Sequence, residues 1–326
     1  MDDPNPLWRQ DLAQGYALFA TQHVEKLTSR EILGTALAAM NAVVAKPAPV
    51  PRFTEASDAV PADLEEFLAT VDGVVRANPA VSPLTLRDAA FTALVALRPD
   101  PHTVYWLRIE DSPVYPLLQG RCEIRSELRP GAIGCVSWDT WLVRETFDIV
   151  AEVRARLDVL VHDGAKGWLF DLRGNRGGSA ALKTASMFLE GGQPLVRRTH
   201  RDGTIENMLA DGSLRLPESY QLPIAVVVDH QSWSATELFA FTLRQNGRAI
   251  LVGERTAGFV GSINGDPLPG GGFVGVKVMH VTGPNGEVYN RVGVMPDIEA
   301  AGDDAVGIAE RLLREKIAAP AGAARP

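Results

Sequence analysis

Apolar residues recur at helical spacing in the first third of the chain. Between residues 7 and 44 they return every three to four positions, which predicts two amphipathic helices. Prolines at positions 47, 49 and 51 end this pattern, because closely spaced prolines cannot continue a helix. Two further helices are predicted over 62–76 and 85–97. Residues 1–107 are therefore expected to form a helical N-terminal domain.

Beyond residue 99 the pattern changes to short apolar strands that alternate with helices. Strands are predicted over 132–136, 167–172, 223–228 and 249–252, and helices over 145–161, after 181, after 235 and over 304–317. Such alternation is typical of a largely parallel sheet covered by helices. Residues 272–292 are predicted to form a hairpin with an Asn-Gly turn. Residues 108–326 are therefore expected to form an α/β core.

Composition narrows the class of protein. The chain has 326 residues, is 46% hydrophobic and carries a net charge of −8, which indicates a globular protein with a substantial core. No stretch concentrates Lys and Arg among aromatics, so a nucleic-acid partner is not expected. No run approaches about 18 apolar residues and no signal peptide is recognised, so no membrane contact and a cytoplasmic location are expected. Export is the alternative if a leader was removed. Cys122 and Cys135 form no Cys-x-x-Cys pair, so no metal site is expected.

A hydroxyl lies at a predicted strand-to-helix turn. Ser234 follows the apolar run 223–228 and precedes a helix, where free backbone N–H groups can hold a developing oxyanion. The alternative for a lone serine at this position is an N-cap. Ser232, two residues earlier, is a rival nucleophile.

A glycine-rich loop follows the predicted strand 167–172. Gly174, Gly177 and Gly178 allow the backbone to approach a ligand and to aim N–H groups inward, although a flexible turn is the alternative. The loop lacks the lysine of a phosphate loop and the spacing of a dinucleotide fingerprint, so nucleotide binding is not expected.

Five segments in order carry a family resemblance. They read DPHTVY at 100–105, DLRGNRGG at 171–178, SWSATE at 232–237, GERTAG at 253–258 and GVMPD at 293–297. Over roughly residues 90–315 the chain resembles the C-terminal processing proteases, together with the tricorn core and retinoid-binding-protein-like branches. The resemblance implies a ClpP/crotonase-like core and a serine peptidase without a cofactor. Many such proteases insert a peptide-binding PDZ module, but the gap from 107 to 131 is too short for one.

The resemblance assigns roles to individual residues. It implies that Ser234 is the nucleophile, that the N–H of Ala235 is one oxyanion donor, and that Gly177 or Gly178 supplies another. The expected reaction is hydrolysis of peptides or flexible protein tails through an acyl-enzyme, with a peptide or unfolded protein as partner and a homo-oligomer as a possible assembly.

The general base departs from the family pattern. Processing proteases use a lysine in a Thr-x-Gly-Lys motif, but Phe259 occupies that position here. Tricorn-like relatives use an upstream histidine, and His102 matches it, since an imidazole can take the serine proton and return it to the leaving amine. Lys277 from the following hairpin is the alternative base, and His230 could also come near Ser234. The residue that orients the base is unassigned, with Glu287 as a weak substitute.

Two other functions are compatible with these residues. A family member without turnover could bind a peptide or an apolar ligand, which the missing lysine favours. An esterase could use the same groups, because a nucleophile and an oxyanion hole do not distinguish amides from esters.

Overall fold

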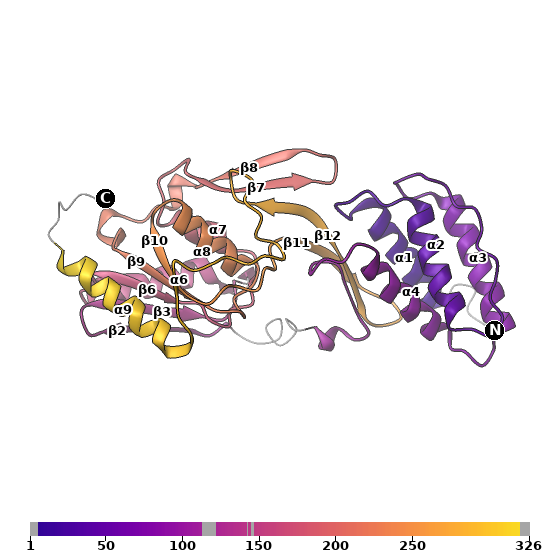
Figure 1. The fold of residues 1–326 in the computed structure, drawn as a ribbon, viewed down its shortest axis with the longest axis horizontal. Helices are drawn as coiled ribbons and strands as arrows, with labels where there is room; N and C mark the ends of the chain where they lie inside the picture. The colour runs from indigo at the N-terminus through magenta and orange to yellow at the C-terminus, as the bar shows by residue number, and fades with distance from the viewer. Residues whose placement is uncertain (1–5, 113–121, 142, 145–146, 320–326) are drawn as a thin grey trace. The chain divides into compact units, whose positions relative to one another are not determined.

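The computed structural model describes residues 6–112, 122–141, 143–144 and 147–319 (Figure 1). The chain divides into two compact units. Unit 1 comprises Met1–Pro116, Thr199–Thr204 and Gly261–His280, and unit 2 comprises the remaining segments. The boundary expected at residue 107 stays a prediction; unit 1 of the structure also takes in two segments that come much later in the sequence. The expectation of no PDZ module concerns a gap that lies partly outside the described residues and stays a prediction.

The four helices predicted for the N-terminal region are confirmed. Two of them begin at a proline in the first turn, where the missing N–H costs nothing. Another begins after Thr28, whose side chain accepts from Glu31 N while the Glu31 carboxylate accepts from Thr28 N, a capping box. The helices are α1 (Leu7–Thr21), α2 (Ser29–Ala42), α3 (Pro61–Ala77) and α4 (Pro83–Leu97).

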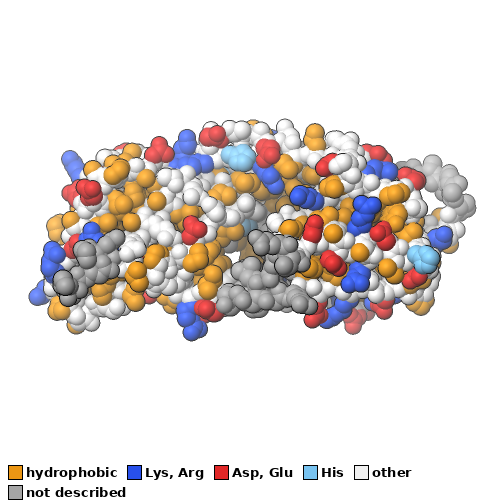
Figure 2. Space-filling view, turned by 180° about the vertical axis from the view of Figure 1, so that it is seen from behind, with side chains coloured by type: hydrophobic (Ala, Val, Ile, Leu, Met, Phe, Trp, Pro, Cys, Tyr) orange, Lys and Arg blue, Asp and Glu red, His pale blue; other side chains and the backbone are white. Residues whose placement is uncertain are grey.

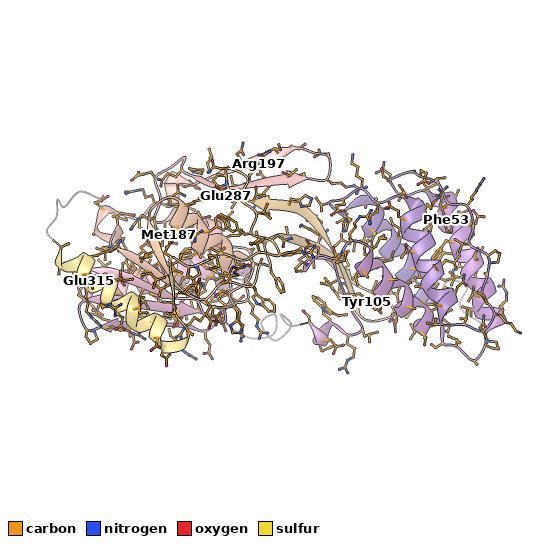
Figure 3. The ribbon with its side chains drawn as sticks, in the orientation of Figure 1. Phe53, Tyr105, Met187, Arg197, Glu287 and Glu315 are labelled. Atoms are coloured by element: carbon orange, nitrogen blue, oxygen red, sulfur yellow. The ribbon has the colours of Figure 1, made fainter. Side chains whose placement is uncertain are left out.

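Unit 1 has its own apolar core between these helices. Phe19, Phe53, Phe67 and Phe91 are at most 2% exposed, and Figure 3 labels Phe53 beside the helices. Each buried aromatic side chain of this size contributes about 1.5–3 kcal/mol through removal of apolar surface from water. The amphipathic pattern of the sequence is therefore satisfied within unit 1.

Three antiparallel strands of a five-stranded sheet lie largely in the same unit. Strand β12 (Phe273–Thr282) pairs with β1 (Val104–Trp106) and with β11 (Ser262–Pro267), and the short helix η1 (Ile109–Asp111) follows β1. The hairpin predicted over 272–292 is wrong, because residues 287–292 form no strand. The turn of the observed hairpin runs through Gly271 and Gly272, whose φ angles of 91° and 95° suit glycine.

Unit 2 contains the largely parallel sheet that the sequence predicts. Its strands follow one another across the sheet in chain order, parallel except for one antiparallel edge pairing. Because the parallel strands share one direction, the residues that follow them gather at one edge. In order the strands are β2 (Ile124–Arg129), β3 (Ile133–Trp138), β6 (Gly167–Asp171), β9 (Ile224–Val228), β10 (Ala249–Gly253) and β13 (Ile298–Glu299).

Helices cover the faces of this sheet. Ala305, Ala309 and Leu313 of α9 (Gly302–Ala318) pack in one cluster with inward residues such as Leu169 and Val227. A second cluster is aromatic, with rings of Trp138, Trp141, Phe170 and Phe239. The other elements of this unit are α6 (Ile149–His162), α7 (Ala181–Ser186), α8 (Ala235–Gln245), β4 (Val143–Arg144), β5 (Phe147–Asp148), β8 (Ile205–Leu209), η2 (Gly212–Leu214) and η3 (Glu218–Tyr220). Strand β7 (Pro194–His200) precedes β8.

Charged side chains of both signs share the surface. Figure 2 shows acidic and basic groups interspersed over the described part of one face. Exposed ion pairs such as Arg125–Glu123 also occur on the surface. Across the described ranges, none of the helices is long and apolar enough to cross a bilayer.

Candidate active site

Ser234 lies at the turn between β9 and α8, as the sequence predicts. It has φ 49° and ψ −111°, a conformation that non-glycine residues rarely adopt, and it directly precedes the first helical residue, Ala235. An ordinary N-cap serine has extended backbone angles. Strain of this kind costs about 1–3 kcal/mol and persists only where surrounding contacts enforce it. Ser234 N donates to Glu237 as in a capping box, but the backbone angles of Ser234 differ from those of an ordinary N-cap residue.

Glu237 enforces the conformation of this turn. Its Oε2 accepts from Ser234 N at 2.8 Å and from Phe259 N at 2.8 Å, and its Oε1 accepts from Thr256 Oγ1 at 2.5 Å and Gly258 N at 2.8 Å. Glu237 is fully buried, and burial raises the pKa of its carboxyl. One side chain thus ties the Ser234 turn to the segment 256–259. Glu237 is part of the segment SWSATE, but its place in that segment alone predicted no role for it.

Ser232 has a structural role in the loop before α8. It is fully buried, its Oγ donates to Leu172 O at 2.9 Å, and the same oxygen accepts from Asp229 N at 3.0 Å. A hydroxyl engaged in this way holds the loop and is shielded from a substrate. Ser232 is therefore a poor rival to Ser234.

The glycine-rich loop lies against Ser234. A Cβ added to Gly177 would meet the Ser234 Cβ at 2.9 Å and Ala235 N at 3.2 Å, so only glycine fits. Gly177 N donates to Asn175 Oδ1 at 3.0 Å. Of the two glycines that the resemblance offers as the second oxyanion donor, this bond leaves Gly178. Gly178 has φ 142°, and its N–H and that of Ala235 have no acceptor among the described residues.

Asn175 connects the loop with the Ser234 turn, a function that the sequence did not reveal. Its side-chain Nδ2 donates to Trp138 O at 2.8 Å, and its Oδ1 accepts from Thr236 Oγ1 at 2.7 Å. Its backbone O accepts from Trp233 N at 2.9 Å. Because Asn175 is fully buried, these bonds fix the spacing between the glycines and α8.

An aromatic pair flanks the Ser234 turn. The rings of Trp233 and Phe259 lie 4.8 Å apart, and the Arg176 guanidinium lies 5.3 Å from the Trp233 ring. Phe259 occupies the position at which the resemblance would place a lysine, so unit 2 has an apolar ring there and no amine.

The base candidates His102 and Lys277 both belong to unit 1, where they share one carboxylate. Thr103 N donates to Asp100 O at 2.9 Å, and Pro101 follows the first residue of this turn, as its fixed φ favours. His102 Nδ1 lies 3.2 Å from Asp100 Oδ1, and Lys277 Nζ lies 2.8 Å from Asp100 Oδ2. Burial raises the pKa of Asp100, but hydrogen bonds from His102 and Lys277 outweigh it and lower the pKa below its ordinary value.

The weaker candidates have other partners. His230 is exposed, and its Nδ1 lies 2.7 Å from Glu254 Oε2, a bond that raises the pKa of the imidazole. Glu287 accepts from the backbone and side-chain nitrogens of Asn285. Both side chains therefore have local structural partners.

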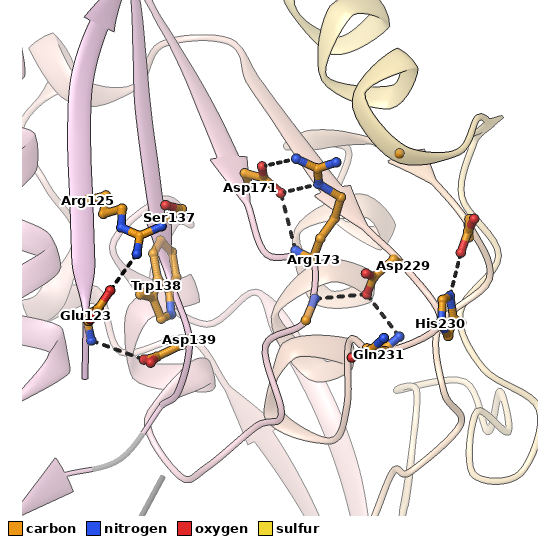
Figure 4. Close-up of a pocket in the computed structure, with 13 residues that line it drawn as sticks. Glu123, Arg125, Ser137, Trp138, Asp139, Asp171, Arg173, Asp229, His230 and Gln231 are labelled. Carbon is orange, nitrogen blue, oxygen red and sulfur yellow. Dashed lines mark hydrogen bonds and ion pairs between the residues drawn. The ribbon is translucent and has the colours of Figure 1, made fainter. Parts of the chain in front are cut away.

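A cavity of about 660 Å³ lies at the carboxyl edge of the parallel sheet (Figure 4). Ser137, Asp171, Asp229 and Glu254 line it, each within one residue of the end of a strand. Its acidic groups are engaged, for example Asp171 with Arg173 and Asp229 with backbone N–H groups. Among the residues that the structure describes, no group of three or more His, Cys, Asp or Glu side chains could hold a metal ion.

Comparison with known proteins identifies relatives of this chain. The model of peptidase family S41 matches residues 133–300. A carboxyl-terminal-processing protease of Picosynechococcus sp. is 33% identical over 162 residues, which cover 48% of this chain and 37% of that protein. The Bacillus subtilis carboxy-terminal processing protease CtpA is 28% identical over 46% of this chain and 32% of its own length. The chain thus spans about a third of the length of these curated relatives.

Solved structures extend the likeness to the N-terminal region. A lipoprotein from Streptococcus agalactiae gives a TM-score of 0.58 at 15% identity, covering 89% of this chain and 97% of that chain. A structure from Parabacteroides merdae gives 0.57 at 18% identity, covering 99% and 100%. At such identities the likeness concerns the fold alone. The family match spans more than half of the sequence and includes the Ser234 turn and the glycine loop: the chain belongs to peptidase family S41.

Proposed function

We propose that this chain is a serine peptidase that hydrolyses peptide bonds of peptides or flexible protein tails through an acyl-enzyme. The names of its relatives, carboxyl-terminal-processing proteases, support the substrate class. The observation that carries the proposal is the strained Ser234 turn held against a glycine that nothing larger can replace. Nucleophiles are commonly presented on such turns, with backbone N–H groups beside them.

In the proposed reaction, Ser234 Oγ attacks the carbonyl carbon of the scissile bond. The carbonyl oxygen becomes an oxyanion that accepts hydrogen bonds from Ala235 N–H and Gly178 N–H, each worth about 10²–10³-fold in rate. A general base takes the serine proton and returns it to the leaving amine, so that the acyl-enzyme forms and is then hydrolysed by water. The proposed base is His102. It lies in the other unit from Ser234, and its pairing with the serine rests on the sequence resemblance.

The test is reaction with a fluorophosphonate probe and hydrolysis of an unstructured protein such as casein. Ser234→Ala is expected to abolish both the labelling and the hydrolysis. Its midpoint of unfolding by denaturant should equal that of the wild type. Ser232→Ala serves as the matched control, because it removes buried hydrogen bonds worth about 1 kcal/mol each but leaves the nucleophile. Hydrolysis that survives in Ser234→Ala would reject the assignment. Saturable peptide binding by a wild-type protein that the probe does not label would instead indicate a binding protein.

A further inference from the structure

The sequence left the residue that orients the base unassigned, and in the structure Asp100 lies beside His102. We infer that Asp100 positions His102 for proton transfer, with Lys277 holding that carboxylate in place, an inference that rests on the proposed function of the chain. Lys277 is then a structural counter-charge and not the general base. The three residues come from a single unit, so their mutual geometry is fixed locally.

The tautomer of His102 follows from its partner. The low pKa of Asp100 keeps the carboxylate ionised, and an ionised carboxylate only accepts hydrogen bonds. His102 Nδ1, 3.2 Å from Asp100 Oδ1, therefore carries the proton. The lone pair of the neutral imidazole is then on Nε2, which has no hydrogen-bond partner among the described residues. This is the arrangement that a histidine base requires.

Two further contacts limit the movement of the ring. Asp100 Oδ1 also accepts from His102 N at 2.9 Å, so the same oxygen fixes both the backbone and the imidazole. On another side, a Cβ added to Gly261 would lie 2.7 Å from His102 Nδ1 and 2.9 Å from Cε1. His102 is only 7% exposed, so its ring has little room to rotate.

Lys277 is engaged elsewhere and is not free to act as a base. Its Nζ lies 2.8 Å from Asp100 Oδ2, its side chain is 7% exposed, and its backbone N donates to Thr103 Oγ1 at 3.3 Å. An ammonium in an ion pair has no lone pair with which to accept a proton. It also prevents the other carboxylate oxygen from turning away from His102.

Other titratable groups face this network. His23 Nε2 lies 3.3 Å from Thr103 Oγ1, and burial lowers the pKa of His23. His280 on β12 also has a pKa lowered by burial and by the charge of Lys277. Glu25 interacts electrostatically with both of these histidines. A pH profile alone would therefore mix several titrations, so the test needs a signal from His102 itself.

The test combines two measurements on the full chain with the variants Asp100→Asn, Lys277→Met and the control Asp72→Asn. The first is the rate of labelling by a fluorophosphonate between pH 5 and 9. The second is the imidazole ¹⁵N shifts of His102, recorded in a Ser234→Ala background. Asp72 lies on α3 in the same unit and pairs with Arg9. Asp72→Asn therefore shows the effect of removing a carboxylate that does not contact His102 or Lys277.

The inference predicts an Nδ1–H tautomer for His102 and its loss in Asp100→Asn. Labelling of that variant should fall at least 10²-fold, within the range known for general-base catalysis. Lys277→Met should keep the tautomer and remain reactive, and Asp72→Asn should match the wild type. Unchanged labelling and tautomer in Asp100→Asn would overturn the inference. So would abolished labelling in Lys277→Met with an unchanged His102 spectrum, which would identify the lysine as the base.

Gly261→Ala provides an independent test of the inference if Asp100→Asn does not fold. Gly261→Ala inserts a methyl group against the imidazole without changing any charge. It should move the His102 ¹⁵N shifts and lower labelling, whereas unchanged values would contradict a positioned ring. If the wild type is not labelled at all, the proposed peptidase function fails. An Nδ1–H tautomer that depends on Asp100 would still support the local assignment in that case, and its absence would overturn it.

Discussion

Gly177 lies directly against Ser234, and a methyl group on it would come within 2.9 Å of the Ser234 Cβ. Gly177→Ala should therefore displace the glycine loop from α8, with φ 88° adding backbone strain. We expect fluorophosphonate labelling to fall by about 10²-fold or more, because the oxyanion donors lose their alignment. Labelling kinetics measure the loss of reactivity, and a urea titration measures the loss of stability.

Gly174→Ala is the matched control for that variant. Gly174 has a similar φ of 71° in the same loop, but a Cβ there would meet nothing within 4 Å. It should cost only backbone strain, about 1–2 kcal/mol, and keep the wild-type rate. Equal losses of activity in both variants would show that strain, and not the contact with Ser234, explains the effect.

Glu237→Gln tests the side chain that holds the Ser234 turn. The carboxylate accepts four hydrogen bonds, whereas an amide would place an NH₂ group against two N–H donors. We expect the free energy of unfolding to fall by about 1–3 kcal/mol and the labelling rate to fall with it. Glu315→Gln, on the exposed side of α9, should change stability by less than about 0.5 kcal/mol. Chemical denaturation followed by tryptophan fluorescence gives both values.

A buried ion pair stabilises unit 1. Arg87 and Asp11 are almost fully buried at 2.6 Å, and they also bond to Gly271 O and Gly270 N of the β11–β12 turn. Arg87→Met should cost about 3–5 kcal/mol, because it leaves a buried carboxylate without its counter-charge. Arg9→Met breaks a partly exposed pair with Asp72 and should cost less than about 1 kcal/mol. Similar costs in the two variants would contradict this account.

Asp100 makes stability depend on pH in the acid range. Its pKa is lower in the folded protein than its ordinary value of 3.8, so the folded state favours the ionised form. The resulting stabilisation is fully present above pH 3.8 and is lost as the pH falls through the folded value. As the pH falls below 4, the free energy of unfolding should therefore decrease less for Asp100→Asn than for the wild type. Parallel slopes of unfolding free energy against pH would disprove the contribution.

Local sequence pattern predicted most of the fold. Helical spacing gave the four N-terminal helices, and the alternation of short apolar strands with helices gave the parallel sheet. The order of the motifs gave the family. These features depend on neighbours along the chain, which is why they can be read without coordinates. The hairpin after residue 272 was mispredicted because its Asn-Gly turn is a strong local signal. Pairing of β12 with the preceding β11 is a tertiary choice.

The sequence by itself determined that Ser234 precedes a helix, that a glycine loop exists, and that His102 and Lys277 were the candidate bases. Only the tertiary structure decided which groups are engaged: Gly177 N–H and the Ser232 hydroxyl are bonded internally, and Asp100 lies between His102 and Lys277. The reason is physical. Hydrogen bonds and ion pairs depend on distances of about 3 Å between residues up to 177 positions apart. No spacing along the chain encodes those distances.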